Sequence, residues 1–304
     1  MTIEYAPLYV VPTPLGNLAD ISERARDALR AVFWVAAEDT RHSAPLLRHI
    51  GAKARLLPAH AHNENAAAQR VLAILARGES VALISDAGTP GISDPGARIV
   101  AHAHAAGARV IPLPGPCAAV TALSAAGFSE AQWLFFGFLP ARSGQRRAAL
   151  KTIAALPCAL AFYEAPHRIL ESLTDMAEEL GETRALLIAR EISKQFETLQ
   201  RLLLGEAAAW IAADPMRQKG EFTLIVSGAT VSPADEGERL LRLFLAENLP
   251  IKQASKLAAT LSGHSKNALY AQALEIRRQR TEQRTEKLPA GYESKLLRRF
   301  APRF

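Results

Sequence analysis

Four short segments of the sequence combine glycine, proline and polar side chains directly after apolar runs, which is the pattern of ligand-binding loops at strand ends. They are TPLGNL (13–18), SDAGTPGISDPG (85–96), LPGPCAA (113–119) and FYEAPHR (162–168). Ligands in open α/β sheets bind beyond the carboxyl ends of the strands, and glycine and proline let the backbone approach a ligand closely. The motifs GxGxxG, GxxxxGKS/T, GxSxG and HExxH do not occur in the sequence. The loops therefore predict a binding site without favouring dinucleotide, P-loop, hydrolase or zinc chemistry.

The last of these segments brings three functional side chains together. Glu164, His167 and Arg168 follow the apolar run CALAF (158–162), which is more typical of a site than of a random turn. Alternatively, Glu164 pairs with Arg168 four residues further on, and His167 caps the helix that follows. The sequence leaves both interpretations open.

The elements that must position these loops alternate between short apolar runs and amphipathic helical patterns. In the first half the expected strands are LYVVP (8–12), WVAA (34–37), RLLPA (55–59), VALISDAG (81–88) and RVIPLPG (109–115). The expected helices cover 21–33, 43–51, 63–78, 95–107 and 117–127. Strands that are apolar throughout and are joined by helices indicate a largely parallel sheet covered on both faces.

The second half repeats this alternation with different spacing. Its expected strands cover 133–140, 158–166, 184–192, 198–205 and 221–228, and its expected helices cover 145–156 and 167–181, the first with Arg146, Arg147 and Lys151 on its polar side. VSPADEG (231–237) is expected to be a linker, and two or three helices follow it without a strand. The prediction is an α/β fold of two α/β/α domains, residues 1–118 and 119–230, with a small C-terminal helical extension and basic tail, residues 231–304.

Composition indicates a globular cytoplasmic protein. The chain has 304 residues, 49% hydrophobic and 22% charged, and no apolar stretch of about 18 residues, which argues against disorder and against a membrane-spanning helix. Its start lacks the basic region of a secretory signal, and two isolated cysteines favour a reducing cytoplasm. No metal is expected, because the AHAH stretches (59–62, 101–104) have no further ligand at suitable spacing.

The positive charge is confined to one end of the sequence. The net charge is +6, and residues 277–304 hold 9 Lys/Arg against 3 Asp/Glu, so the whole excess lies there. Such a tail attracts phosphate backbones or only keeps the surface soluble. The charge makes an anionic partner plausible and does not name it.

Eight segments in order along residues 8–228 carry a resemblance to a known family. They are LYVVPTPLGNLADIS, AEDTRHS, HNEN, ALISDAGTPGISDPG, PLPGPCAAVTAL, FYEAPHR, AREISKQFE and GEFTLIVSG. The sequence resembles the tetrapyrrole methylase superfamily, and within it the bacterial subgroup that methylates the ribose 2′-hydroxyl of a cytidine in small-subunit (16S) ribosomal RNA at the decoding region. ASKLAA and SKNALYAQAL also resemble that subgroup's C-terminal extension. The first loop, PTPLGNL, departs from the GxGPGD-like loop of tetrapyrrole-modifying members and favours the RNA subgroup.

The resemblance implies a cofactor, its binding residues and partners. It implies S-adenosylmethionine in the cleft between two α/β/α domains, a homodimer, and small-subunit ribosomal RNA as substrate. The implied cofactor-binding residues are Pro14, Leu15, Ser85, Asp86, Ala87, Thr89, Cys117, Ala118, Phe162, Tyr163, Glu221, Phe222 and Thr223. Cys117 stands where many relatives have serine.

A ribose hydroxyl is a poor nucleophile until it loses its proton, so a base is expected near the reacting atoms. The first candidates are Glu164, His167 and Glu38, and the further ones are Asp39, Glu191 and Lys194. The side chains expected to contact RNA are Arg41, Arg146, Arg147, Arg168, Arg277 and Arg278. Two alternatives remain: a C-methyltransferase acting on a tetrapyrrole such as uroporphyrinogen or precorrin, and a non-catalytic RNA-binding assembly factor.

Overall fold

The computed structural model describes residues 4–229 and 233–286. The chain divides into two compact units, residues 1–229 and residues 230–304. The first unit contains two five-stranded sheets, and the second is helical. The predicted α/β class with a C-terminal helical region is therefore confirmed.

The first sheet is parallel throughout, as the buried apolar runs predict. Its strand order is β3-β2-β4-β1-β5, and every neighbouring pair is parallel. The strands are β1 (Leu8–Val10), β2 (Trp34–Ala37), β3 (Arg55–Pro58), β4 (Val81–Ile84) and β5 (Val110–Pro112). Because all strands run the same way, the loops that follow β2, β4, β1 and β5 meet at one edge of the sheet.

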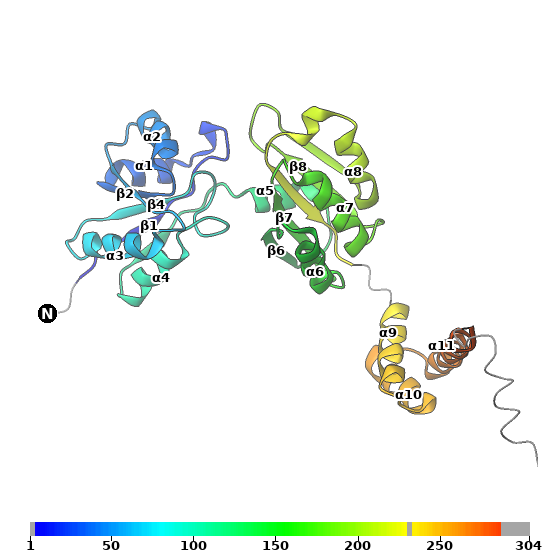
Figure 1. Ribbon diagram of the computed structural model, residues 1–304. Coiled ribbons are helices and arrows are strands. Elements are labelled where there is room, and N and C mark those ends of the chain that lie inside the picture. The colour runs from blue at the N-terminus through cyan, green and yellow to red at the C-terminus, as the bar shows by residue number, and fades with distance from the viewer. Residues whose placement is uncertain (1–3, 230–232, 287–304) are drawn as a thin grey trace, which may run out of the picture. The chain divides into compact units, whose positions relative to one another are not determined.

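Helices cover both faces of this sheet (Figure 1). On one face lie α1 (Glu23–Ala31) and α2 (Thr40–His49), whose Leu29 and Leu47 share a core cluster with Val35 of β2. On the other face lie α3 (Glu64–Leu75) and α4 (Ala97–Ala105), which pack with Ala36, the next residue of β2. Adjacent residues of β2 thus enter opposite cores, as the two-residue period of a strand requires.

The second sheet is mixed rather than parallel, with the order β6-β7-β10-β8-β9. Its strands are β6 (Trp133–Phe138), β7 (Ala159–Glu164), β8 (Ala185–Arg190), β9 (Thr198–Leu203) and β10 (Phe222–Val226). Only β6 and β7 are parallel; β10 runs antiparallel to both β7 and β8. β8 and β9 are joined without a helix, so they pair as an antiparallel hairpin.

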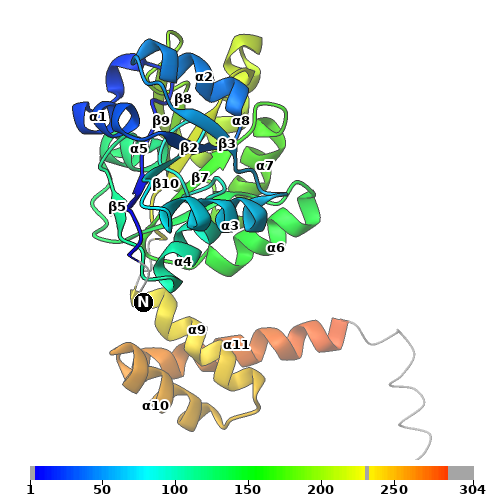
Figure 2. The same ribbon diagram turned by 90° about the vertical axis from the view of Figure 1, so that its left-hand side faces the viewer.

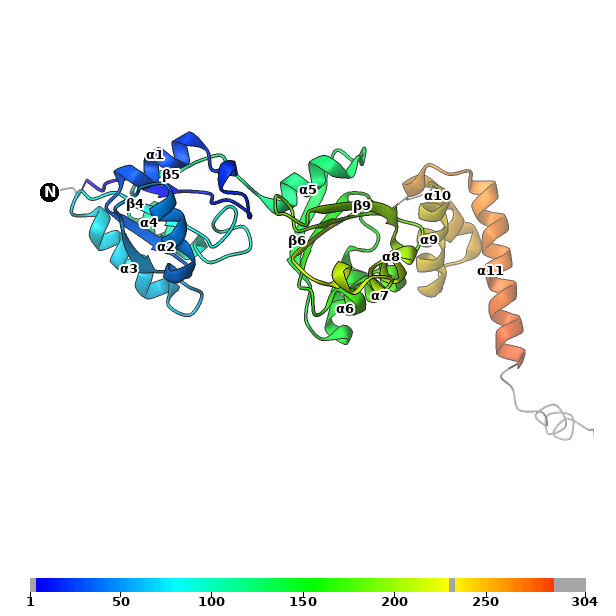
Figure 3. The ribbon, with the colours of Figure 1, turned by 90° about the horizontal axis from the view of Figure 1, so that it is seen from above.

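This sheet is also covered on two faces (Figure 3). α5 (Ala118–Ala126) packs its alanines on one face against Ala161 and Ile225. Three helices cover the other face, where Phe162 and Leu224 are buried. They are α6 (Ser143–Ile153), α7 (Ile169–Leu180) and α8 (Leu204–Ala212).

The helical unit contains α9 (Pro233–Ala246), α10 (Ile251–Ser262) and α11 (Lys266–Glu286), which pack around Leu241, Ala258 and Leu269 (Figure 2). Two or three helices were predicted here, and three are observed. The expected linker 231–237 is wrong in extent, because α9 already begins at Pro233. Of the basic tail 277–304, residues 287–304 lie outside the described residues. No helix within the described ranges has the length and apolar character needed to cross a membrane.

Candidate functional site

Hydrogen bonds tie the four loops at the edge of the first sheet into one framework. After β2, the backbone N–H of Asp39 donates to Asp86 Oδ1 at 3.1 Å, in the loop after β4. Thr13, after β1, exchanges two backbone hydrogen bonds with Gly88, at 2.9 and 3.0 Å. Thr89 Oγ1 donates to the carbonyl of Pro116, after β5, at 2.8 Å. Three of the four loops singled out in the sequence, 13–18, 85–96 and 113–119, are therefore brought together, and the loop after β2 joins them.

Gly88 and Ser85 give the loop after β4 its shape. Gly88 has φ +79°, and a Cβ there would lie 3.2 Å from Leu15 Cδ2, so the position requires glycine. The Ser85 side chain is 1% exposed, and its hydroxyl donates to the carbonyl of Gly88 at 3.1 Å. The hydroxyl of Ser85 is thus engaged in folding the turn.

A cavity of about 380 Å³ lies between this framework and the end of the second sheet. We call it the acidic cavity, because five side chains with carboxyl groups line it. Its lining includes Glu38, Asp86, Asp94, Glu164 and Glu221, with no Lys or Arg among the described residues. Apolar and aromatic groups complete the wall, namely Leu15, Ile92, Phe138, Tyr163, Pro166 and Phe222.

Most of the predicted cofactor-binding residues meet in this cavity. Those that line it are Leu15, Asp86, Ala87, Thr89, Cys117, Ala118, Tyr163, Glu221, Phe222 and Thr223. Pro14 and Ser85 instead line a second cavity of about 480 Å³, which we call the mixed cavity. The two cavities are adjacent, because four residues line both: Leu15, Asp86, Ala87 and Glu221.

Phe162 is the one predicted cofactor-binding residue that the structure excludes from both cavities. Its side chain is 0% exposed and lies in the core under α6–α8, with its ring centroid 5.7 Å from that of Phe136. The neighbouring Tyr163 points to the opposite face of β7, where its hydroxyl accepts a hydrogen bond from Ala119 N at 3.2 Å. The prediction for Phe162 was wrong because adjacent strand residues face opposite sides.

Glu164 lines the acidic cavity, but its carboxylate is already fully engaged. Oε1 accepts hydrogen bonds from Arg168 Nε at 2.9 Å and Ala165 N at 2.7 Å, and Oε2 accepts one from Ser172 Oγ at 2.6 Å. The side chain is 1% exposed. The pairing with Arg168 that the sequence left open is therefore what forms, and both oxygens already accept hydrogen bonds within the protein, which makes Glu164 a less suitable base. His167 is exposed and lines neither cavity; it borders a separate hollow with Leu170 and Gln218.

Glu38 is the candidate base whose environment suits proton transfer. Burial, together with the nearby charges of Asp94, Asp86 and Asp39, raises its pKa to about 6. Burial and Asp86 also raise the pKa of Asp94. Hydrogen bonds from Arg41 instead lower the pKa of Asp39 to about 2, which makes it a weak proton acceptor.

Lys194 and Glu191 form an ion pair at the edge of the mixed cavity. Lys194 Nζ lies 3.0 Å from both Glu191 Oε1 and Glu221 Oε2. Burial lowers the pKa of Lys194, but its bonds to the two carboxylates outweigh burial and the net shift is upward. Burial alone would raise the pKa of Glu191, but hydrogen bonds from Glu221 N and Lys194 outweigh burial, so its pKa is lowered overall. The two ion pairs therefore favour the cationic form of Lys194, which makes it a less suitable base than Glu38.

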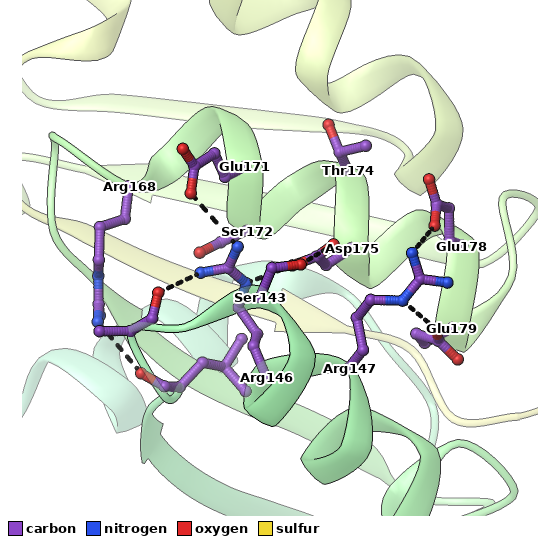
Figure 4. A network of polar contacts seen from close by, with 12 residues as sticks. Ser143, Arg146, Arg147, Arg168, Glu171, Ser172, Thr174, Asp175, Glu178 and Glu179 are labelled. Carbon is purple, nitrogen blue, oxygen red and sulfur yellow. Dashed lines mark hydrogen bonds and ion pairs between the residues drawn. The ribbon is translucent and has the colours of Figure 1, made fainter.

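The basic residues predicted to contact RNA differ in how accessible they are. Arg146 was expected on the polar side of its helix, but it is 1% exposed and pairs with Asp175 at 2.6 Å across α6 and α7 (Figure 4). That prediction was wrong: the buried Asp175 and the carbonyl of Ala141 hold the guanidinium, and Ser143 donates a further hydrogen bond to Asp175. A buried and neutralised Arg146 is not available to a phosphate.

The other predicted RNA contacts retain some exposure. Arg147 is 41% exposed in its side chain and pairs with Glu178 and Glu179 of α7 (Figure 4). Arg168 is 16% exposed and is held by Glu164. Arg41 is 91% exposed beside Asp39 and borders the mixed cavity, and Arg277 and Arg278 are exposed on α11.

The cavity residues that were not singled out in the sequence include Asp94, Phe138 and Ser43. Asp94 lies within the quoted loop, where SDPG resembles an ordinary turn. Phe138 ends β6 and is 53% exposed, and an aromatic side chain at a strand end is the signal that could have found it. Ser43 sits inside a helical pattern, where a single serine gives no signal.

Two family models match the chain. The model "Tetrapyrrole (Corrin/Porphyrin) Methylases" matches residues 7–208, and "RsmI C-terminal HTH domain" matches residues 231–277. Among solved structures, the methyltransferase CobJ is 20% identical with a TM-score of 0.56, over 74% of this chain and 95% of that chain. Uroporphyrin-III C-methyl transferase from Thermus thermophilus, complexed with S-adenosyl homocysteine, is 16% identical with a TM-score of 0.53, over 73% and 97%. These structures share the fold.

The chain belongs to the tetrapyrrole methylase family, and it is a methyltransferase that uses S-adenosylmethionine. Within that family it is similar to proteins named ribosomal RNA small subunit methyltransferase I. The protein of that name from Escherichia coli O157:H7 is 52% identical over 88% of this chain and 94% of its own length. The one from Pseudomonas aeruginosa is 50% identical over 88% and 96%.

The acidic cavity fits S-adenosylmethionine in chemical character. The cofactor carries a sulfonium cation, which the carboxylates favour, and an adenine ring, which needs apolar and aromatic walls. Phe138 and Tyr163 supply such a wall, with ring centroids 5.7 Å apart. The cavity volume of about 380 Å³ lies within the ordinary range for small-molecule sites.

Proposed function

We propose that this protein transfers a methyl group from S-adenosylmethionine, held in the acidic cavity, to the ribose 2′-hydroxyl of a cytidine in small-subunit ribosomal RNA. The relatives with about half their residues identical bear names that specify small-subunit ribosomal RNA. The resemblance of the loop sequences is the basis for proposing cytidine as the nucleotide and its ribose 2′-oxygen as the methyl acceptor. The acceptor-binding side chains would come from the first unit, and phosphate contacts from Arg41, Arg147 and Arg277.

The charge of the site is the observation that favours an RNA ribose over a tetrapyrrole. Five carboxylates line the acidic cavity. Glu164 is paired with Arg168 and Glu221 with Lys194, which leaves Glu38, Asp86 and Asp94 without a cation in the described lining. A polycarboxylated tetrapyrrole such as uroporphyrinogen would be repelled by this excess of negative charge. A ribose is uncharged, and its phosphates can remain outside near exposed arginines.

We assign the role of base to Glu38. The cofactor supplies an activated methyl group on sulfur. Glu38 would accept the proton of the 2′-hydroxyl, so that the oxygen could take the methyl group that the bound cofactor would supply. A carboxyl with a pKa of about 6 is ionised at neutral pH and still basic enough to take this proton. The protein's remaining contribution is the alignment of oxygen, methyl and sulfur.

We further propose a cytoplasmic homodimer and a division of residues 1–230 into two domains near residue 118. Ribosomal RNA is made in the cytoplasm of bacteria, and both cysteines are free. Every strand of the first sheet precedes Leu113, and α5 packs on the second sheet. The edge strand β9 carries exposed Leu199 and Leu203, which supports a protein contact at this edge. Light scattering on the purified protein tests the dimer.

The function is tested by supplying the purified protein with methyl-labelled S-adenosylmethionine and three separate acceptors. They are small ribosomal subunits from a strain that lacks this gene, naked small-subunit RNA, and uroporphyrinogen. We expect label in the ribosomal RNA, recovered after nuclease digestion as 2′-O-methylcytidine. Label in uroporphyrinogen alone would establish the tetrapyrrole alternative, and RNA binding without cofactor binding would establish the assembly factor.

A further inference from the structure

The mixed cavity is a compartment of its own beside the acidic cavity. Its wall is formed by the loop Thr13–Gly16 after β1, by the first turns of α2 from Arg41 to Leu46, and by Lys194 from the loop after β8. It holds about 480 Å³. The residues it shares with the acidic cavity lie at their junction, so a group bound in one cavity can contact a group bound in the other.

Ser43 is an unpartnered polar group in this wall. Its side chain is 3% exposed and lines the mixed cavity. Within the part of the chain that the structure describes, its Oγ has no hydrogen-bond partner. Buried hydroxyls are nearly always hydrogen-bonded, and leaving one unpaired costs free energy. An orphan hydroxyl at the wall of a cavity therefore indicates a ligand that supplies its partner.

The backbone around Lys194 is held in an unfavourable conformation. Glu191 has φ +53° and Ser193 has φ +69°, both in the left-handed region. Ser193 Oγ donates to Asp20 of the first half, and a Cβ on Gly16 would collide with the Lys194 side chain. Strained residues persist where the surroundings hold them, often at functional sites. Here the strain places Lys194 in the wall of the mixed cavity, paired with Glu221, which lines both cavities.

The charges in the mixed cavity balance. Arg41 and Lys194 are offset by Asp86 and Glu221. The remaining lining is largely apolar, from Pro14, Leu15, Leu18, Pro45 and Leu46. A compartment of this kind suits an uncharged ligand with a flat ring and several hydroxyl groups, which is the chemistry of a nucleoside.

We propose that the mixed cavity takes the nucleoside part of one nucleotide turned out of the RNA strand, with Ser43 Oγ hydrogen-bonded to it and the Lys194–Glu221 pair beside its ribose. Sequence-specific RNA recognition generally uses unstacked nucleotides of this kind. The ribose then lies at the junction, where its oxygen can reach a methyl group in the acidic cavity. This inference rests on the proposed function. It assigns the mixed cavity to the methyl acceptor and Ser43 to its recognition.

The test uses Ser43→Ala in the full-length protein, with Ser124→Ala as the matched control. Ser124 is an exposed helical serine on α5 whose hydroxyl already donates to Thr121 O at 2.8 Å. If Ser43 lacks a partner until the acceptor binds, Ser43→Ala should raise the melting temperature of the free protein by roughly 2 °C. It should also raise KM for small subunits about threefold to tenfold, the worth of one hydrogen bond. The Kd of S-adenosylmethionine should stay within twofold, and Ser124→Ala should leave all three values unchanged.

Lys194→Met provides a second reading that does not depend on Ser43. It should raise KM for small subunits at least tenfold and change the Kd of S-adenosylmethionine by less than threefold. An unchanged KM in both variants would overturn the proposal, and so would a loss of cofactor affinity without a change in KM. A lower melting temperature for Ser43→Ala would show that its hydroxyl is satisfied within the protein, which also contradicts the proposal. Failure of the wild-type protein to methylate small subunits would instead refute the proposed function.

Discussion

Replacing Glu38 by Gln separates its role as a base from its effect on stability. The substitution keeps the shape of the side chain and removes its charge. If Glu38 accepts the 2′-hydroxyl proton, the single-turnover rate with small subunits should fall by about 10² to 10⁴, the usual range for a general base. The Kd of S-adenosylmethionine should rise only modestly, because Asp86 and Asp94 remain in the cavity.

The pH dependence follows from the raised pKa of Glu38. The base is active when ionised, so kcat/KM of the wild-type protein should rise with pH and level off above a pKa of about 6. At pH 5 about one molecule in ten has Glu38 ionised, so kcat/KM should be roughly one-tenth of its plateau. In Glu38→Gln, kcat/KM should no longer rise between pH 5 and pH 7. We would measure both proteins from pH 5 to pH 9.

The same shift predicts the sign of the stability change. Folding raises the pKa of Glu38 from 4.5 to about 6, so the folded state disfavours the ionised carboxylate. This unfavourable contribution is absent below pH 4.5 and complete above pH 6. The shift corresponds to about 2 kcal/mol, and to about 1 kcal/mol after discounting for solvent screening of this partly exposed group. Urea unfolding should therefore show Glu38→Gln more stable than wild type at pH 8 and equal to it at pH 4. A variant that is less stable at pH 8 and retains the wild-type rate would refute the reasoning.

Three further predictions concern the cofactor, the fold and the RNA. Asp86→Asn should weaken S-adenosylmethionine binding about tenfold or more in calorimetry by removing a cavity carboxylate, whereas Asp27→Asn on the exposed face of α1 should not. Arg146→Met should lower the free energy of unfolding by about 3–5 kcal/mol, because it leaves Asp175 buried and unpaired. Arg147→Met, at a more exposed ion pair, should lower it by less than about 1 kcal/mol. Equal losses in the two variants would contradict the argument from burial. Residues 287–304 hold 5 Lys/Arg and 1 Asp/Glu. Removing them should flatten the slope of log affinity for RNA against log salt concentration by up to about 3. An identical slope would exclude this segment from the RNA contact.

The fold could be predicted from the sequence because its elements have strong local signals. Runs such as VALI (81–84) are buried at every position, and only a strand covered on both faces produces this pattern. The glycine- and proline-rich loops marked the strand ends, so their meeting at one edge followed from parallel pairing. The antiparallel β10 could not be foreseen, because strand direction depends on which strands pair, and pairing is not encoded locally.

The roles of individual side chains were harder to predict, since they depend on contacts between distant segments. The sequence around Arg146 predicts a surface residue, because its contact with Asp175 on the next helix forms only in the folded protein. The sequence predicts a free carboxylate at Glu164, whereas in the structure Arg168 and Ser172 donate hydrogen bonds to its two oxygens. The raised pKa of Glu38 arises first from burial and then from the charges of Asp94 and Asp86, about fifty residues away in sequence. Spacing along the chain carries none of this information.

The central claim is tested most directly by mapping ribose 2′-O-methylation across small-subunit RNA in a strain that lacks the gene, and in the same strain supplied with wild-type protein or with Glu38→Gln. We predict one cytidine ribose methyl group that is absent without the gene, restored by the wild-type protein and not restored by Glu38→Gln. An identical methylation map in all three strains would contradict the proposed function. Restoration by Glu38→Gln to the wild-type level would contradict the mechanism.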